Sequence, residues 1–409
     1  MRRAFLSASI MNVLAMVFIF IEGVLLARYL GPEGRGAISM YMAAFLLVFP
    51  LATLGVKQST AYSIGKANIE YSSMCITQWR FLPISVVLLT TILLLLYWWM
   101  GLLTDTLLII VMLIAFNLKI MLDYISGFAI GTNNVVYQYS SELVRSSVSI
   151  VFLIGIIIFN KLSIFVYFAI QCFSQFIVML YVLTWLPSVA NSLKSRRGTG
   201  SSFSYVEFCS RGIRYSLPLF IMGLNYSSDI LLLGKLASDH DVGIYAAAVA
   251  LASMTWFFPN LLASMFFSRS ISTHSKGETE ATHYVLNKLK IIMVIMLLFV
   301  ISLVIMSETI VVNLYGGDFF ESINVIYILM PGIYLMILFK ILNSELSGRG
   351  ITDLAIKVFS TTFIINLALN IILIPEYTYL GAAIATSVSY SLGALCFTAI
   401  YYTKYIKLK

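Results

Sequence analysis

Six ionisable residues lie inside apolar stretches that are long enough to cross a membrane. Four are acids and two are lysines: Glu22, Asp123, Asp229, Glu345, Lys119 and Lys340. A charge near the centre of a membrane helix costs about 2.5–3.5 kcal/mol, so it normally faces protein or a water-filled cavity and finds a partner there. These residues predict either ion pairs that hold a helical bundle together or the polar wall of a transport cavity.

The spacing of these charges decides which of them can pair within one helix. Lys119 and Asp123 are four residues apart, so they share a helical face and can form a structural salt bridge. Whether they do so, or instead face a cavity, is open. Lys340 and Glu345 are five residues apart and pair less well, so at least one of them needs another partner, for which Asp229 is a candidate.

Two other positions add polar groups to the predicted helices. Asn225 lies four residues before Asp229 and gives that helix one polar face. Glu22 either faces the cavity or pairs with Arg28, almost two turns further along the chain.

The composition places the chain among multi-pass membrane proteins. Of its 409 residues, 60% are hydrophobic and only 11% are charged, against about 25% charged in a soluble globular protein. Lipid offers no hydrogen-bond partners to the backbone, so the spanning segments are predicted to be helices. Twelve runs are long enough to span, near 8–28, 36–56, 81–101, 106–130, 143–159, 163–186, 213–235, 242–266, 288–306, 322–346, 355–374 and 379–402.

The distribution of lysine and arginine predicts the orientation in the membrane. If the N-terminus is cytoplasmic, the cytoplasmic segments carry twenty of these residues and the external loops carry four. Both termini are therefore expected in the cytoplasm, with the N-terminal "MRR" and its apolar run retained as the first helix. The net charge of +8 is explained by this topology and by contact with anionic lipid, so nucleic acid is not an expected partner.

The chain divides into two similar halves. The longest hydrophilic stretch, residues 193–214, separates six predicted spans from six. At an offset of 207 residues, Glu22 aligns with Asp229, Arg28 with Lys235 and Gly36 with Gly243. We therefore expect an N-terminal six-helix bundle at 1–192, a cytoplasmic linker at 193–212 and a C-terminal six-helix bundle at 213–409.

No pattern in the sequence favours an enzyme. The glycine-rich "GPEGRG" at 31–36 lacks the Gly-Lys-Ser/Thr ending of a phosphate-binding loop. The three histidines are too scattered for a metal site or a nucleophilic triad. Neither a catalytic residue, a metal nor an organic cofactor is expected.

Four segments of the chain resemble one family of membrane proteins. They are "ARYLGPEGRGAISMY" (27–41), "LYGGDFFESINVIYILMPG" (314–332), "SGRG" (347–350) and "LIPEYTYLGAAIATSVSY" (373–390). Together they resemble bacterial polysaccharide repeat-unit flippases, the O-antigen and exopolysaccharide (Wzx-type) transporters. These belong to a superfamily that also contains the multidrug-and-toxin extruders and the lipid II flippases.

The resemblance implies an all-α fold of two six-helix bundles arranged in a V around a central cavity, with alternating access. The implied substrate is an undecaprenyl-diphosphate-linked oligosaccharide, moved from the cytoplasmic to the periplasmic leaflet of the bacterial inner membrane. The implied partners are this lipid, the surrounding membrane lipids, and the polysaccharide polymerase and chain-length machinery.

In this family cationic residues of the cavity attract the anionic substrate, and Lys119 and Lys340 match that role by position. Further candidates for the cavity wall are Asp123, Glu345, Asp229, Asn225 and Glu22, and candidates for its mouths are Arg28, Lys235, Arg145 and Arg349. The acids beside the lysines leave the cavity nearly neutral, so Asp123, Asp229 or Glu345 is alternatively the site of a coupling cation, a proton or sodium.

Two other functions are weighed against this one. A drug or organic-cation antiporter of the same superfamily should have an acidic cavity without lysines, which Lys119 and Lys340 argue against. A membrane glycosyltransferase or polymerase acting on the same lipid-linked sugar usually has a long catalytic loop. Outside residues 193–214 the predicted loops here are short.

Overall fold

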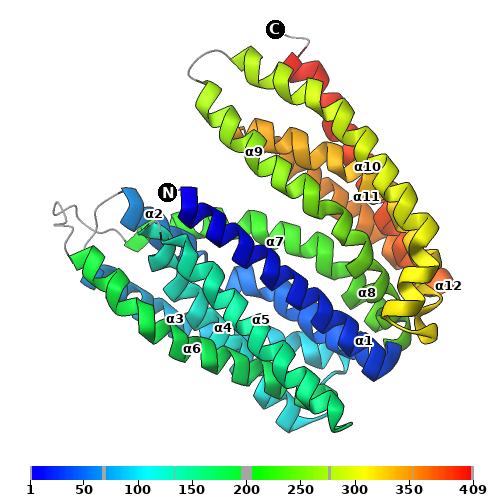
Figure 1. Ribbon diagram of the computed structural model, residues 1–409, viewed down its shortest axis with the longest axis horizontal. Coiled ribbons are helices and arrows are strands. Elements are labelled where there is room, and N and C mark those ends of the chain that lie inside the picture. Colours follow the sequence, from blue (N-terminus) through cyan, green and yellow to red (C-terminus); the bar gives the residue numbers. More distant parts are fainter. Residues whose placement is uncertain are drawn as a thin grey trace. The chain divides into compact units, whose positions relative to one another are not determined.

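A computed structural model describes residues 2–66, 71–132, 134–194, 205–274, 278–351 and 353–406 (Figure 1). Over these ranges the regular structure is helical, without a strand. Ten of the described helical stretches are long and apolar enough to cross a membrane. The chain is therefore an all-α, multi-pass membrane protein, as the sequence predicts.

Two of these ten stretches are much longer than a bilayer requires. Ser7–Ala52 has 46 residues and Asp353–Lys404 has 52. Each contains one non-helical residue, Gly31 with φ 67° and Thr378 with φ 46°. These breaks fall between the first and second and between the eleventh and twelfth predicted spans, and the count of twelve remains a prediction.

The described chain forms two compact units. Unit 1 comprises Met1–Leu30 and Tyr41–Phe220, and unit 2 comprises Gly31–Met40 and Ile221–Lys409. The bundle boundaries and linker predicted from the sequence stay a prediction, and residues 195–204 of that linker lie outside the described ranges.

Unit 1 is arranged around helix α4. It contains most of α1 (Arg2–Ala52), α2 (Val56–Lys66), α3 (Tyr71–Met100), α4 (Thr106–Gly131), α5 (Val135–Ile158), α6 (Ile164–Lys194) and the start of α7 (Tyr205–Leu236). Helix α4 contacts α2, α3, α5 and α6. It begins at an N-cap, where the side chain of Asp105 accepts hydrogen bonds from the backbone nitrogens of Leu107 and Leu108.

Two glycines allow α2 to approach α4 closely. Gly127 and Gly131 form a Gly-x-x-x-Gly pair on one face of α4, an arrangement that brings membrane helices together. A methyl group at Gly127 would lie 2.8 Å from the carbonyl oxygen of Lys57, and one at Gly131 would lie 2.8 Å from Cβ of Ile64. Asp123 lies one turn before Gly127, so this approach brings Lys57 beside it.

Unit 2 is arranged around helix α11. It contains the rest of α7, α8 (Asp239–Ser253), the 3-10 turn η1 (Met254–Trp256), α9 (Phe257–His274), α10 (Glu278–Leu314), the 3-10 turn η2 (Gly317–Phe319), α11 (Ser322–Gly348), α12 (Asp353–Ile400) and the π-helical turn η3 (Tyr401–Ile406). Helix α11 contacts α8, α9, α10 and α12. Its backbone nitrogen at Gly332 donates to Ser387 Oγ at 3.2 Å, which fixes α12 against it.

Two glycines that the 207-residue offset aligns also lie side by side in unit 2. A methyl group at Gly36 would collide with the backbone of Asp239, and one at Gly243 would collide with the backbone of Pro32. Both positions therefore require glycine because two backbones meet there.

Candidate functional site

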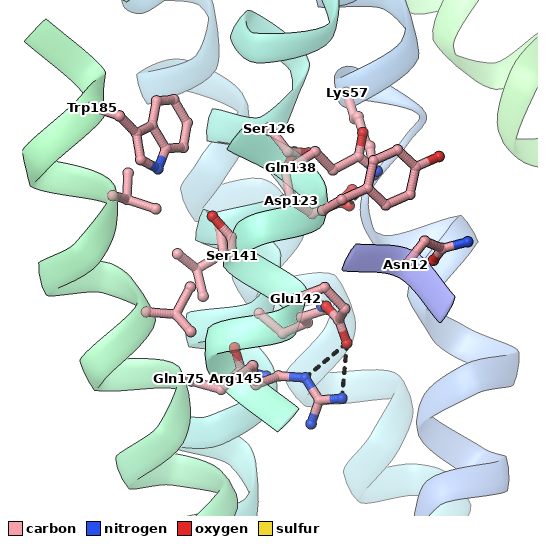
Figure 2. Close-up of a pocket in the computed structure, with 15 residues that line it drawn as sticks. Asn12, Lys57, Asp123, Ser126, Gln138, Ser141, Glu142, Arg145, Gln175 and Trp185 are labelled. Carbon is pink, nitrogen blue, oxygen red and sulfur yellow. Dashed lines mark hydrogen bonds and ion pairs between the residues drawn. The ribbon is translucent and has the colours of Figure 1, made fainter. Parts of the chain in front are cut away.

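A polar cavity of about 400 Å³ lies within unit 1 (Figure 2). Its lining residues are Asn12 from α1, Lys57 from α2, Lys119, Leu122, Asp123 and Ser126 from α4, Gln138, Tyr139, Ser141, Glu142 and Arg145 from α5, and Gln175, Val178, Val182 and Trp185 from α6. On α4, α5 and α6 the lining residues recur every three or four positions, so each of these helices turns one face to the cavity.

Two ion pairs between helices and one within α5 occupy the charged groups of this cavity. Lys57 Nζ lies 2.9 Å from Asp123 Oδ1, and Lys119 Nζ lies 3.0 Å from Glu142 Oε2. Arg145 Nη2 lies 2.8 Å from the other carboxylate oxygen of Glu142, as Figure 2 shows. Three cations and two carboxylates leave the cavity with a net charge of +1.

The predicted salt bridge between Lys119 and Asp123 is therefore wrong. Both side chains lie on the same face of α4 and line the same cavity. Each pairs with a residue of a neighbouring helix instead, because α2 and α5 bring Lys57 and Glu142 within reach. The alternative interpretation, that Lys119 and Asp123 belong to a cavity wall, agrees with this geometry.

A hydrogen-bonded chain leads from the cavity to Glu22. Arg145 Nη1 donates to Gln171 Oε1 at 3.2 Å, and Gln171 Nε2 donates to Glu22 Oε1 at 2.5 Å. Gln171 Nε2 also contacts Ser149 Oγ at 3.0 Å. Glu22 is buried and takes part in this network of unit 1, whereas Arg28, its alternative partner in the sequence, is exposed.

The predicted site residues of unit 2 are held in separate groups. Glu345 is fully buried, forms an ion pair with Arg349 and accepts a hydrogen bond from Tyr401 at 3.0 Å. Lys340 Nζ donates to Asn260 Oδ1 at 3.3 Å. It also lies 4.4 Å from the ring centroid of Trp256, within the range of a cation–π interaction.

Asp229 does not pair with Lys340 or any other described base. Its carboxylate accepts hydrogen bonds from Tyr245 at 2.8 Å, Thr386 at 2.5 Å and Asn370 at 2.6 Å. The proposed pairing of Asp229 with a lysine is therefore wrong. Neutral donors from α8 and α12 surround it, in a site that is 3% exposed.

The other predicted site residues lie apart from these groups. Asn225 is buried and donates to the carbonyl oxygens of Ile221 at 3.0 Å and Phe359 at 3.3 Å. Lys235 is exposed near the end of α7. Of the predicted residues of unit 1, the structure brings Lys119, Asp123 and Arg145 to one cavity and connects Glu22 to it.

Sequence reasoning missed Lys57, Glu142 and Gln171. The second predicted span ends at residue 56 and the fifth begins at 143, so Lys57 and Glu142 each fell one residue outside a predicted span. In the structure α5 begins at Val135, two turns earlier than the predicted span. The spacing of Glu142 and Arg145, three residues apart, was a signal that the two share a helical face.

A family comparison identifies the larger group to which the chain belongs. The family described as "Polysaccharide biosynthesis protein" matches residues 1–267. The chain belongs to this family. The matched range includes every residue that lines the cavity of unit 1.

One curated relative is similar to part of the chain. A probable low-salt glycan biosynthesis flippase, Agl15 of Haloferax volcanii, is 26% identical over 236 residues, which cover 56% of this chain and 48% of that protein. The chain thus matches about half the length of this relative.

The fold is shared with transporters of the MOP superfamily. An inward-facing multidrug resistance MATE transporter of that superfamily matches with a TM-score of 0.77 at 14% identity, over 95% of this chain and 96% of the other. The lipid II flippase MurJ in an inward closed conformation matches with a TM-score of 0.73 at 13% identity, over 97% and 87%. These similar proteins are flippases and transporters rather than enzymes, in agreement with the prediction that this chain is not an enzyme.

Proposed function

We propose that the protein is a flippase for an undecaprenyl-diphosphate-linked oligosaccharide repeat unit in the synthesis of a surface polysaccharide. The substrate moves from the cytoplasmic to the periplasmic leaflet of a bacterial cytoplasmic membrane by alternating access. Both termini are cytoplasmic, in accord with the distribution of lysine and arginine. Family membership and the named glycan flippase relative support the class of substrate.

The observation that carries the proposal is the polar cavity inside a unit whose surface is apolar. Residues such as Val87, Trp98 and Ile158 are more than 60% exposed on that surface, as expected for helices that face lipid. A sugar chain and a diphosphate cannot enter hydrocarbon without a large desolvation cost. Side chains that replace their water inside the protein remove this cost.

In unit 2, Lys340 is the candidate contact for the diphosphate. The three cations that line the cavity of unit 1 each have a carboxylate within 3.0 Å. Lys340 has only neutral partners among the described residues, Asn260 and the ring of Trp256. Its charge is therefore available to an anion without breaking an ion pair.

Asp229 is the candidate site for a coupling cation, either a proton or sodium. Of the three acids considered for this role, Asp123 pairs with Lys57 and Glu345 pairs with Arg349. Asp229 is surrounded by neutral groups alone, and Asn370 Oδ1 beside it accepts no hydrogen bond from the described protein. A buried carboxylate with neighbouring oxygens suits a proton or a hard cation.

Transport in liposomes tests the proposal directly. The purified protein is reconstituted with lipid-linked oligosaccharides extracted from its own host, and the fraction of glycan accessible to an external glycosidase is followed in time. We expect accessible glycan to increase faster than in protein-free liposomes. Failure to move any lipid-linked oligosaccharide, together with uptake of organic cations, would support the antiporter alternative instead.

A further inference from the structure

The hydrogen-bonding groups of the unit 1 cavity fall into two classes. All five charged groups have a partner of opposite charge within 3.0 Å. Five lining side chains are neutral and form no side-chain hydrogen bond within the part of the chain that the structure describes: Asn12, Gln138, Tyr139, Gln175 and Trp185. The groups left for a ligand are therefore the neutral ones.

Two of these neutral groups are deeply buried. Gln175 is 7% exposed and Trp185 is 5% exposed, and both line the cavity. Gln175 Oε1 is an acceptor and Trp185 Nε1 is a donor, and neither has a partner in the described protein. A buried polar atom without a partner costs about 1–3 kcal/mol, so both atoms favour a ligand that hydrogen-bonds them.

The two groups lie at opposite ends of one helical stripe. Gln175 and Trp185 are ten residues apart on α6, which corresponds to about 15 Å along a helix. Figure 2 shows Trp185 towards one end of the cavity and Gln175 towards the other. Val178 and Val182 lie between them on the same wall. An elongated ligand with polar groups at intervals and apolar C–H faces between them fits this stripe.

The charged groups argue against an anion in this cavity. A diphosphate that bound Lys119 would compete with Glu142, whose carboxylate also pairs with Arg145. Glu142, whose side chain is 33% exposed, would then keep only Arg145 and lie close to a second negative charge, which is costly at a largely buried site. An apolar ligand would leave both Gln175 Oε1 and Trp185 Nε1 without a partner, and a purely cationic ligand, which only donates, would leave the Trp185 Nε1 donor without an acceptor.

We infer that the unit 1 cavity is a subsite for neutral sugar residues, which recognises hydroxyl or N-acetamido groups and not the diphosphate. Both groups combine a donor with an acceptor and carry no charge, as the five open side chains require. The volume of about 400 Å³ suits a few sugar residues, within the range of about 300–1,000 Å³ usual for small-molecule sites. This inference rests on the proposed function, and it assigns binding of the substrate's glycan part to unit 1.

Binding of free glycan to the full-length protein in detergent tests the inference separately from transport. The probes are the oligosaccharide released by mild acid from the host's lipid-linked pool, the same material after N-deacetylation, and inorganic pyrophosphate. Equilibrium dialysis measures each affinity. We expect the released oligosaccharide to bind and pyrophosphate at equal concentration not to compete. Loss of binding after N-deacetylation assigns the contact to acetamido groups, and unchanged binding assigns it to hydroxyl groups.

Three variants replace open hydrogen-bonding groups by apolar side chains of similar or smaller size: Gln138→Leu, Gln175→Leu and Trp185→Phe. Each is expected to weaken glycan binding about tenfold, whereas Gln58→Leu, whose amide lies outside the cavity, leaves it unchanged. Gln138 is only half-buried, so we expect its variant to fold even where a buried substitution does not.

The results separate the inference from the proposed function. The inference is overturned if pyrophosphate competes with the glycan or if no glycan binds. It is also overturned if glycan affinity is unchanged in Q138L and in whichever of the other two variants fold. Glycan binding without transport of the lipid-linked oligosaccharide overturns the proposed function and leaves the sugar subsite standing.

Discussion

Asp123 pairs with Lys57 across two helices at 2.9 Å, although Lys119 lies one turn away on its own helix. The close approach of α2 at Gly127 places Lys57 directly beside Asp123. Lys119 in turn reaches Glu142 on α5 at 3.0 Å. The partner of each lysine is therefore set by how α2 and α5 align with α4, and not by the spacing of charges within α4.

Removing one member of the Lys57–Asp123 pair should cost more than removing both. Both side chains are less than 20% exposed. Asp123→Asn leaves a largely buried ammonium without its counter-charge, and we expect unfolding free energy to fall by about 2 kcal/mol. The double variant Lys57→Met, Asp123→Leu replaces both groups by apolar ones and should recover most of this loss.

Unfolding by titration with sodium dodecyl sulfate, followed by circular dichroism, measures each variant of this pair. A loss in the double variant equal to the sum of the losses in Lys57→Met alone and Asp123→Leu alone would show that the two side chains do not interact.

The glycine approach that positions Lys57 can be tested by adding one methyl group. Gly127→Ala places a Cβ 2.8 Å from the carbonyl oxygen of Lys57 and 3.2 Å from Thr60 Cβ. We expect a loss of about 1–3 kcal/mol from overpacking. The matched control is Gly155→Ala on α5, where a Cβ meets no atom within 4 Å. Equal melting temperatures for the two variants in detergent would contradict the close contact.

Much of the fold follows from sequence, because each property involved is local. Apolar length predicts membrane helices, and the breaks at Gly31 and Thr378 fall in gaps between predicted spans. The charges at Lys119 and Asp123 were recognisable because any charge in an apolar run is unusual. Their partners were not, because Lys57 lies on an 11-residue helix too short to span and Glu142 lies before the apolar part of α5.

The candidate sugar contacts show the same limit. Gln175 and Trp185 are unremarkable in the sequence, since tryptophan is common near the ends of membrane helices and a single glutamine carries no charge. Their interest comes from two facts that only packing decides: both line one cavity, and one atom of each has no partner in the described protein.

Lys340 should determine transport without determining stability. Lys340→Gln removes the positive charge above Trp256 but keeps a donor for Asn260. We expect the rate of transport of the lipid-linked oligosaccharide to fall more than tenfold, a change of at least about 1.4 kcal/mol. Lys340→Arg keeps the charge and should retain part of the transport rate. Lys161→Gln, in the exposed connection after α5, is the control.

Initial rates in liposomes at matched protein content measure the effect of these lysine substitutions. Full transport by K340Q would exclude Lys340 as the diphosphate contact.

Asp229 and Glu345 should respond differently to loss of charge, because their surroundings differ. Asp229 has only neutral donors around it, so Asp229→Asn leaves no cation unpaired. Glu345→Gln leaves the Arg349 side chain, 4% exposed, without its carboxylate, at a cost of about 3–5 kcal/mol. We therefore expect D229N to stay folded and E345Q to lower the melting temperature.

Transport with and without imposed proton and sodium gradients distinguishes the two roles. In D229N a gradient should no longer accelerate transport, while slow exchange without a gradient persists, because the variant lacks the charge that a proton or sodium neutralises. E345Q that reaches the liposomes folded should still respond to the gradient. If D229N responds as the wild type does, the coupling ion binds elsewhere and the neutral cluster around Asp229 has a structural role.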